Sequence, residues 1–283
     1  VHLSIHDIPF CFHVSSEAII QELFEHYPVS WFERPESERA KSIPIFWVDS
    51  RDVGFTDEEW ENEESPECSI AHSSTGQVAT HRDFAAHFDG ATCLLVCPYA
   101  VQDGFFNFLR WFAPTEFLKR GLLLFHSSCV IDAEKNAYFC FGPSGAGKST
   151  IASLRTRSKV LGDDMNVIAI RGGVCWAQAG ALGQAMLNPG EYGRWYPVRQ
   201  IYWLQKGAEL QITPLSSATQ LRYLATAVAN VFWQNLTEQQ TLQIFSKIQQ
   251  INQLTPLAEL KFPIQKGLWE LIFAHDSRRS DDL

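Results

Sequence analysis

The chain has 283 residues, of which 46% are hydrophobic and 13% aromatic, enough for one large domain or two small ones. Its formal net charge is −9, and an acidic surface repels nucleic-acid backbones, so we expect no nucleic-acid partner. No apolar run reaches the roughly 20 residues of a membrane span. The amino terminus lacks a signal-peptide pattern. We therefore expect neither membrane insertion nor secretion.

The cysteine pattern indicates the oxidation state of the thiols. The chain has seven cysteines, an odd number, with no CxxC pair, and most of them lie in apolar, strand-like segments. This pattern favours reduced, buried thiols and a cytoplasmic protein.

The first 120 residues predict a mixed α/β region. Strand-like alternation over residues 3–14 precedes a helical pattern over residues 15–27. Further strands are expected over residues 43–49, 68–74, 77–81 and 91–99.

Two other segments of this region have a distinctive composition. Residues 57–67 form an acidic run, which favours a solvated loop over a docking site for a basic partner. Residues 104–121 predict one or two helices, and we interpret the aromatic residues of 105–112 as an interdomain core.

The rest of the chain predicts a second α/β region. A hairpin is expected from residues 122–132 and 137–142, then a helix from residue 148 and a short strand over 159–164. Residues 166–173 with 173–179, and 198–207 with 209–216, are predicted to form two more hairpins. Helices over 217–233, 237–254 and 267–276 and a strand over 257–264 complete the prediction.

The segment between the first hairpin and the following helix matches the pattern G-x-x-x-x-G-K-[ST]. Its glycines let successive N–H groups point at phosphate oxygens, and the following helix adds its positive dipole end. Lys148 would lie along the β/γ-phosphates, and the Ser149 hydroxyl would help to hold Mg²⁺. The predicted nucleotide-binding residues are Gly142, Pro143, Ser144, Gly145, Ala146, Gly147, Lys148, Ser149 and Thr150.

Two consecutive carboxylates, Asp163 and Asp164, follow this loop closely. The interval leaves room for one helix and one strand returning beside the loop's own strand, which would bring both to the phosphates. One would hold Mg²⁺, and the other would take a proton from an acceptor hydroxyl. The sequence leaves open which residue has which role. His126, at the end of an earlier strand, is either structural or orients one of the two carboxylates.

The ordered set of His126-Ser-Ser, GPSGAGKST and LGDD resembles HPr kinase/phosphorylase and its phosphoenolpyruvate-carboxykinase-type relatives. The resemblance covers roughly residues 120–265. It implies a P-loop kinase core with a mixed sheet over residues 121–283, preceded by the smaller mixed α/β region of residues 1–120.

The resemblance also implies ATP- and Mg²⁺-dependent phosphorylation of a hydroxyl. By position, Lys148 and Ser149 match the phosphate and Mg²⁺ residues. His126 matches the active-site histidine, and Asp163 with Asp164 match the catalytic acidic pair. HPr kinases assemble as rings, so a homo-oligomer is compatible with this resemblance.

Two departures separate the chain from the bifunctional enzymes. They usually have Glu where this chain has Thr150, and their downstream signature linked to phosphorolysis is not found. The layout is more similar to stand-alone kinases of this superfamily, including lasso-peptide kinases, which phosphorylate a serine of a precursor peptide. The implied acceptor is therefore a peptide or small protein, and residues 1–120 are a candidate docking part.

Three further residues are weaker candidates. Arg194 or Arg199 would neutralise transition-state charge, and Glu191 would add a carboxylate linked to Mg²⁺. Two alternative functions also remain. One is a small-metabolite kinase with the same machinery, and the other is a nucleotide-sensing regulator without catalysis. The loop does not distinguish ATP from GTP.

Overall fold

The computed structural model describes residues 1–5, 8–27, 42–53, 68–100, 103–155, 159–178, 193–229, 236–255 and 257–281. The acidic run at 57–67 and Glu191 lie outside these residues. The chain is a mixed α/β protein with two compact units, Val1–Lys119 and a second comprising Arg120–Val231 and Thr237–Leu283. Of the helices in the described ranges, none combines the length and apolar character that a membrane crossing requires.

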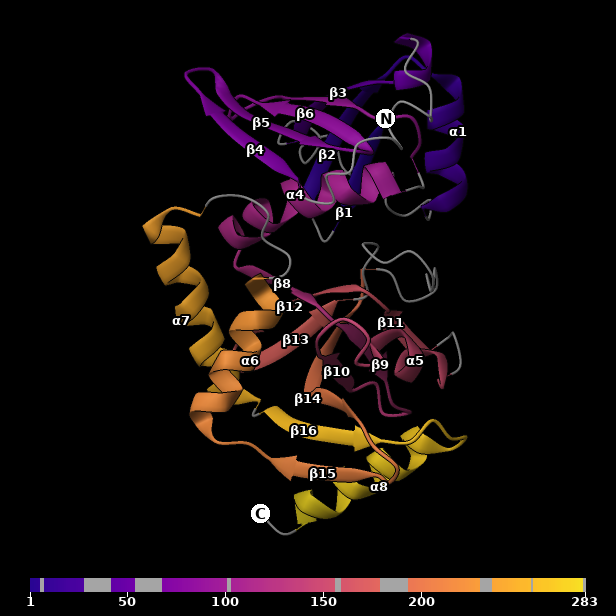
Figure 1. Ribbon diagram of the computed structural model, residues 1–283, viewed down its shortest axis with the longest axis vertical. Helices are drawn as coiled ribbons and strands as arrows, with labels where there is room; N and C mark the ends of the chain where they lie inside the picture. Colours follow the sequence, from indigo (N-terminus) through magenta and orange to yellow (C-terminus); the bar gives the residue numbers. More distant parts are fainter. Residues whose placement is uncertain are drawn as a thin grey trace. The chain divides into compact units, whose positions relative to one another are not determined.

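The first unit is built on a mixed sheet with strand order β1-β2-β3-β7-β6-β5-β4 (Figure 1). β2, β3 and β7 run parallel to one another, and the other neighbours pair antiparallel. Strand β6 was not predicted. The elements are β1 (His2–Ile5), β2 (Ile8–Val14), α1 (Glu17–His26), β3 (Ile43–Val48), β4 (Ser69–Ser73), β5 (Gly76–His81), β6 (Phe84–Phe88), β7 (Cys93–Val96) and α4 (Asp103–Lys119).

Helix α4 supplies the aromatic core of this unit. Phe105 stacks on Trp47 with ring centroids 4.8 Å apart, and Phe108 lies edge-on to Phe84 at 6.0 Å. All four rings are fully or almost fully buried inside the first unit. The interpretation of residues 105–112 as an interdomain core was therefore wrong, because their partners are the strands of their own unit.

The second unit is built on a longer mixed sheet, with β11-β9-β10-β14-β13-β12-β8 as its main path and β16 and β15 added beside β14. Its strands are β8 (Leu122–His126), β9 (Ser128–Ile131), β10 (Ala137–Phe141), β11 (Val160–Gly162), β12 (Met165–Arg171), β13 (Val174–Gln178), β14 (Trp195–Lys206), β15 (Gln211–Pro214) and β16 (Leu257–Phe262). Its helices are α5 (Lys148–Ser153), α6 (Ser217–Ala229), α7 (Glu238–Leu254) and α8 (Leu268–Asp281).

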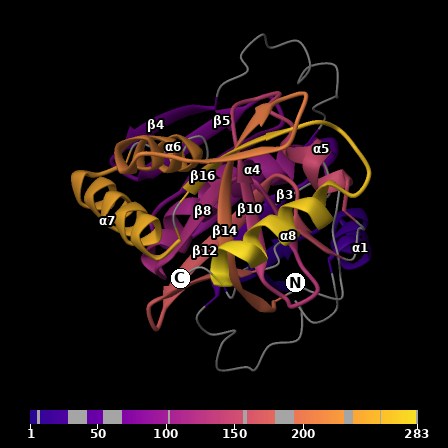
Figure 2. The same cartoon turned by 90° about the horizontal axis from the view of Figure 1, so that it is seen from below.

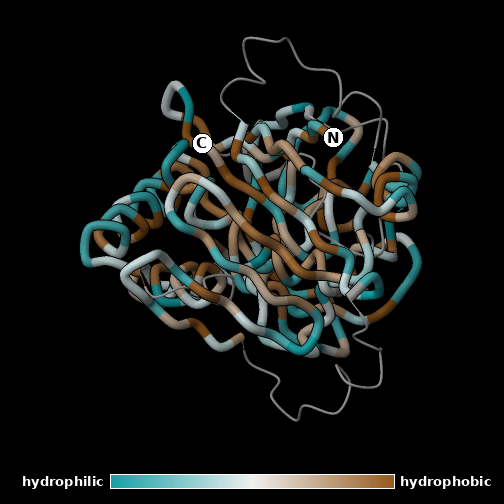
Figure 3. Tube along the Cα trace, turned by 90° about the horizontal axis from the view of Figure 1, so that it is seen from above, coloured by the Kyte–Doolittle hydropathy of each residue, from teal (hydrophilic) through white to brown (hydrophobic). Residues whose placement is uncertain are grey.

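Helices cover both faces of this sheet. α5 and α8 pack through Ile151, Trp269 and Ile272 onto the apolar side chains of β10 and β14. On the other face, Tyr223 of α6 stacks on Trp203 of β14, with ring centroids 3.9 Å apart. In Figure 2, α6 and α7 lie together on the side away from α5 and α8. Figure 3 shows hydrophobic residues mainly in inner segments of the trace and hydrophilic residues at many of its outer turns.

Helix α7 shows how local sequence sets an element's start. Thr237 accepts a hydrogen bond from the Gln240 N–H, and the Gln240 side chain accepts one from the Thr237 N–H, which forms a capping box. The buried residues Ile244, Ile248 and Ile251 recur at helical spacing and form one buried face of the helix.

Three details of strand pairing differ from the predictions. Residues 122–132 form two strands, β8 and β9, separated at Ser127, rather than one. β14 and β15 are not a hairpin, because β16 lies between them and pairs with both. β11 pairs with β9, not with the loop's own strand β10, because the local β9–β10 hairpin already occupies that edge.

Candidate active site

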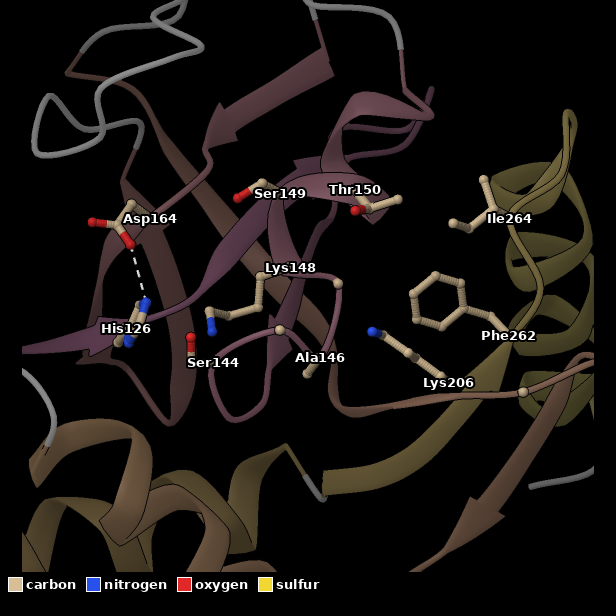
Figure 4. Close-up of a pocket in the computed structure, with 13 residues that line it drawn as sticks. His126, Ser144, Ala146, Lys148, Ser149, Thr150, Asp164, Lys206, Phe262 and Ile264 are labelled. Carbon is tan, nitrogen blue, oxygen red and sulfur yellow. Dashed lines mark ion pairs between the residues drawn. The ribbon is translucent and has the colours of Figure 1, made fainter.

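One cavity of about 540 Å³ lies in the second unit, around the glycine loop of residues 142–150 (Figure 4). The loop joins β10 to α5, and the rest of the wall comes from the ends of β8, β11, β14 and β16. The lining residues are His126, Ser144, Gly145, Ala146, Gly147, Lys148, Ser149, Thr150, Asp164, Lys206, Gly207, Phe262 and Ile264.

The loop has a backbone that only glycine accommodates at two key positions. Gly147 has φ of 102°, and a Cβ there would lie 3.2 Å from Phe262 Cζ. A Cβ on Gly142 would lie 2.7 Å from the Cβ of Ala146. The loop therefore stays tightly folded, and its backbone lines the cavity.

Lys148 is buried beneath this loop. Its ammonium donates hydrogen bonds to the carbonyl oxygens of Gly142 at 2.9 Å and Pro143 at 3.2 Å. Burial lowers the pKa of Lys148, and the negative charge of Asp164 partly opposes that shift. In Figure 4 the Lys148 side chain extends alongside the loop into the cavity. A buried cation that donates to two backbone carbonyls beside the cavity is suited to an anionic ligand.

His126 and Asp164 form an ion pair at one end of the cavity (Figure 4). His126 Nε2 lies 3.0 Å from Asp164 Oδ1, and the two side chains are 22% and 36% exposed. The β8–β12 register places His126 opposite Met165, the residue after Asp164. The Ser127 N–H also donates to the Asp164 carbonyl oxygen at 2.8 Å. Strand pairing thus joins two residues that are far apart in the sequence.

The two neighbouring aspartates differ in their surroundings. Asp164 lines the cavity, whereas Asp163 is buried and is not one of the residues that line it. The structure thereby distinguishes two residues whose roles the sequence left open.

The Asn166 side chain links Ser127 to Gly162, and the sequence analysis did not identify it as a site residue. Its buried side-chain amide donates to the Ser127 carbonyl at 2.7 Å and more weakly to the Gly162 carbonyl at 3.4 Å. Gly162 leaves room for it, because a Cβ there would lie 2.4 Å from Asn166 Oδ1. The available signal was an amide residue within the apolar run MNVIAI.

The opposite wall of the cavity was also missed. Lys206 lies near the end of a predicted hairpin strand and was given no site role, but it lines the cavity with Phe262 and Ile264. Parallel pairing of β14 with β16 places Lys206 directly opposite Phe262. This pairing of distant segments left no local pattern in the sequence.

The weaker candidates lie elsewhere. Arg194 and Arg199 are exposed at the start of β14 and within it, and neither lines the cavity. Gly142 and Pro143 belong to the loop, and their carbonyls contact Lys148 rather than the cavity.

The described residues contain no group of three or more His, Cys, Asp or Glu that could hold a metal ion by themselves. The cavity does place the Ser149 hydroxyl and the Asp164 carboxylate in one lining. Oxygen donors of this kind fit Mg²⁺, which commonly takes one or two protein ligands and completes its shell with water and phosphate.

No family model and no curated protein sequence matches this chain. Among solved structures, the chain is similar to the Hpr(Ser) kinase/phosphatase from Coxiella burnetii, at 13% sequence identity. The similarity covers 56% of this chain and 95% of that chain, with a TM-score of 0.31. This likeness is too distant to assign an activity, which has to be argued from the cavity itself.

Proposed function

We propose that this chain is an ATP- and Mg²⁺-dependent kinase that transfers the γ-phosphate to a serine or similar hydroxyl of a peptide or small protein. One observation carries the proposal: the glycine loop with Lys148 and the His126–Asp164 pair line the same cavity. A phosphate-binding loop and a positioned carboxylate are the two parts that phosphoryl transfer to a hydroxyl requires.

The loop and Lys148 would bind the phosphates. Backbone N–H groups of a glycine loop and a buried ammonium together favour a polyanion. Burial lowers the pKa of Lys148. The negative charge of an adjacent phosphate would raise that pKa again and would favour the charged ammonium. Ser149 would hold Mg²⁺ together with water and phosphate oxygens, and Mg²⁺ would supply charge neutralisation between the β- and γ-phosphates.

Asp164 is the candidate base, because it lines the cavity and contacts His126. The acceptor hydroxyl oxygen would form a bond to the γ-phosphorus while its proton passes to the Asp164 carboxylate. The bond between the γ-phosphorus and the bridging oxygen would break, and its electron pair would remain on ADP. His126 would keep the carboxylate oriented. Asp163, buried beside it, would position this turn.

A peptide or protein acceptor would also need a docking surface. All of the described residues that line the cavity belong to the second unit, and the first unit precedes that unit in the sequence. We assign acceptor docking to this first unit, Val1–Lys119. A kinase for a peptide or protein benefits from such a part, because docking energy holds the acceptor hydroxyl near the γ-phosphate.

The test incubates the full chain with ATP, Mg²⁺ and the peptides and small proteins encoded beside its gene, followed by mass spectrometry. We expect a gain of one phosphate on a serine-containing acceptor, and its loss in Lys148→Met. Lys247→Met is the matched control, because Lys247 also donates to a backbone carbonyl, that of Gly121, and its pKa is also lowered by burial.

The other outcomes separate the alternatives. Transfer to a metabolite but to no peptide would make the chain a small-molecule kinase. ATP binding that depends on Lys148, with no transfer to any acceptor, would overturn the kinase proposal in favour of a nucleotide sensor.

A further inference from the structure

The two ends of the cavity differ in chemistry. In Figure 4, His126 and Asp164 lie at one end, and Lys206, Phe262 and Ile264 lie at the other, with the glycine loop between them. The first end carries the ion pair that the proposed transfer would use. The second end combines one cation with two apolar side chains, a combination that the transfer step does not use.

This second end is a built part of the fold. Lys206 and Phe262 are paired residues of β14 and β16, and the Gly207 N–H donates to the Phe262 carbonyl at 3.2 Å. The Phe262 ring is buried and lies against Gly147, where a Cβ would come within 3.2 Å of it. The aromatic wall is therefore held at a fixed distance from the loop.

Ile264 extends this wall outward. It follows β16 by two residues, and 75% of it is exposed although it lines the cavity. A single exposed aliphatic residue is ordinary on a protein surface. Beside a buried phenyl ring and at the mouth of a polar cavity, it provides an apolar surface for a bound ligand.

We propose that Lys206, Phe262 and Ile264 form the nucleoside end of the site, which takes the base and α-phosphate of a purine nucleoside triphosphate. This inference rests on the proposed function and adds the direction in which the nucleotide lies. Phe262 and Ile264 contact the base, and Lys206 neutralises the α-phosphate.

The direction follows from the positions of the reacting groups. In a loop of this type the lysine reaches the β- and γ-phosphates while the loop backbone holds the α- and β-phosphates. The γ-phosphate must also meet the base that activates the acceptor, and Asp164 lies at the end opposite Ile264. The α-phosphate and nucleoside therefore extend toward Lys206 and Phe262, and the acceptor hydroxyl approaches from the side of His126.

The experiment compares the dissociation constants of ATP and inorganic tripolyphosphate, both with Mg²⁺, for the full chain. Ile264→Ser should weaken ATP binding about tenfold, because it removes apolar contact with the base. Binding of tripolyphosphate, which has no nucleoside, should change less than about twofold. Leu271→Ser is the matched control, since Leu271 is 48% exposed on α8 and does not line the cavity.

Two more variants sharpen the test. Ile264→Trp should tighten ATP binding severalfold through stacking and leave tripolyphosphate unchanged. Lys206→Gln should weaken ATP binding about fivefold, whereas Lys261→Gln, on the same strand as Phe262 and paired with Glu259, should not.

The outcomes also separate this inference from the proposed function. Equal loss of both ligands in Ile264→Ser, or no loss of either, would overturn the assignment of the nucleoside end. Selective loss of ATP binding in a protein that phosphorylates no acceptor would support the nucleoside end and reject the kinase activity.

Discussion

The two units of this protein differ in where they place their buried charged and amide side chains. The core of the first unit is dominated by stacked rings, such as Phe108 on Phe112 at 5.5 Å and Phe105 on Trp47 at 4.8 Å. This unit also buries charged side chains, such as Asp49 and Glu116, but the second unit groups Lys148, Asp163 and Asn166 around one edge of its sheet.

Because of this difference, we expect stability and the proposed reaction to depend on different residues. Burying an aromatic ring is favourable, whereas a buried charge or amide costs free energy unless hydrogen bonds compensate for it. In the second unit, the buried Lys148 belongs to the glycine loop, and the buried Asp163 and Asn166 lie in or next to the turn at Asp163 and Asp164, where the proposed transfer takes place. Substitutions in the aromatic core of the first unit should therefore change mainly stability, and substitutions of the residues that line the cavity mainly activity.

The largest expected effect is on the transfer rate. Asp164→Asn should lower it about 10²- to 10⁴-fold, because the amide cannot accept the acceptor proton, while the affinity for ATP changes only a few-fold. Single-turnover kinetics and calorimetric titration measure the two quantities. Asp163→Asn should lower the transfer rate less, because Asp163 does not line the cavity. The reverse order would show that Asp163 is the base.

The next effect is on the stability of the first unit. Phe108→Ala removes a fully buried ring and should lower the free energy of unfolding by about 3–5 kcal/mol. Denaturant unfolding measures the loss, and ATP affinity should stay unchanged. Phe46→Ala is the control, because Phe46 is 46% exposed and its loss should cost about 1 kcal/mol or less. An equal loss in both variants would contradict the assigned core.

Asn166→Ala tests a residue that should affect both the stability of the second unit and the transfer rate. It leaves the buried Ser127 carbonyl without its 2.7 Å hydrogen bond, which should cost about 1–3 kcal/mol of unfolding free energy. The transfer rate should also fall, because Ser127 fixes the strand end that carries His126. Asn136→Ala, which breaks a hydrogen bond to Asp132 in a turn, should leave the transfer rate unchanged. An unchanged rate in Asn166→Ala would limit Asn166 to a structural role.

The smallest effect is a pH dependence in the first unit. Burial of Asp49 raises its pKa, but hydrogen bonds from Arg51 and Ser16 outweigh burial, so the net pKa lies below its ordinary value. A lowered carboxyl pKa stabilises the fold above the unfolded-state pKa, and this contribution is lost as pH falls through the folded-state pKa. Arg51→Ala should therefore destabilise the protein by about 1 kcal/mol near pH 7 and by less in acid. An equal loss at both pH values, measured by denaturant unfolding, would contradict this coupling.

The sequence predicted the local elements of both units well. The repeat of Ile244, Ile248 and Ile251 indicated a helix, and the pattern from Gly142 to Ser149 indicated a loop between a strand and a helix. Strand pairing was harder, because the strands over residues 198–207 and 209–216 were predicted to pair with each other as a hairpin. β16 enters between β14 and β15 from about 50 residues farther along the chain, and short-range patterns contain no signal for such an insertion.

By itself, the sequence determined the glycine loop, the adjacent aspartates and a mixed α/β protein. The acceptor and the docking role of the first unit stay predictions. The tertiary structure decided which aspartate lines the cavity, that His126 lies 3.0 Å from it, and that Lys206 and Phe262 form the opposite wall. The physical reason is the sequence separation of the residues that interact. A loop is specified by the conformational limits of neighbouring residues, whereas a cavity wall depends on the pairing of strands that are distant in the chain.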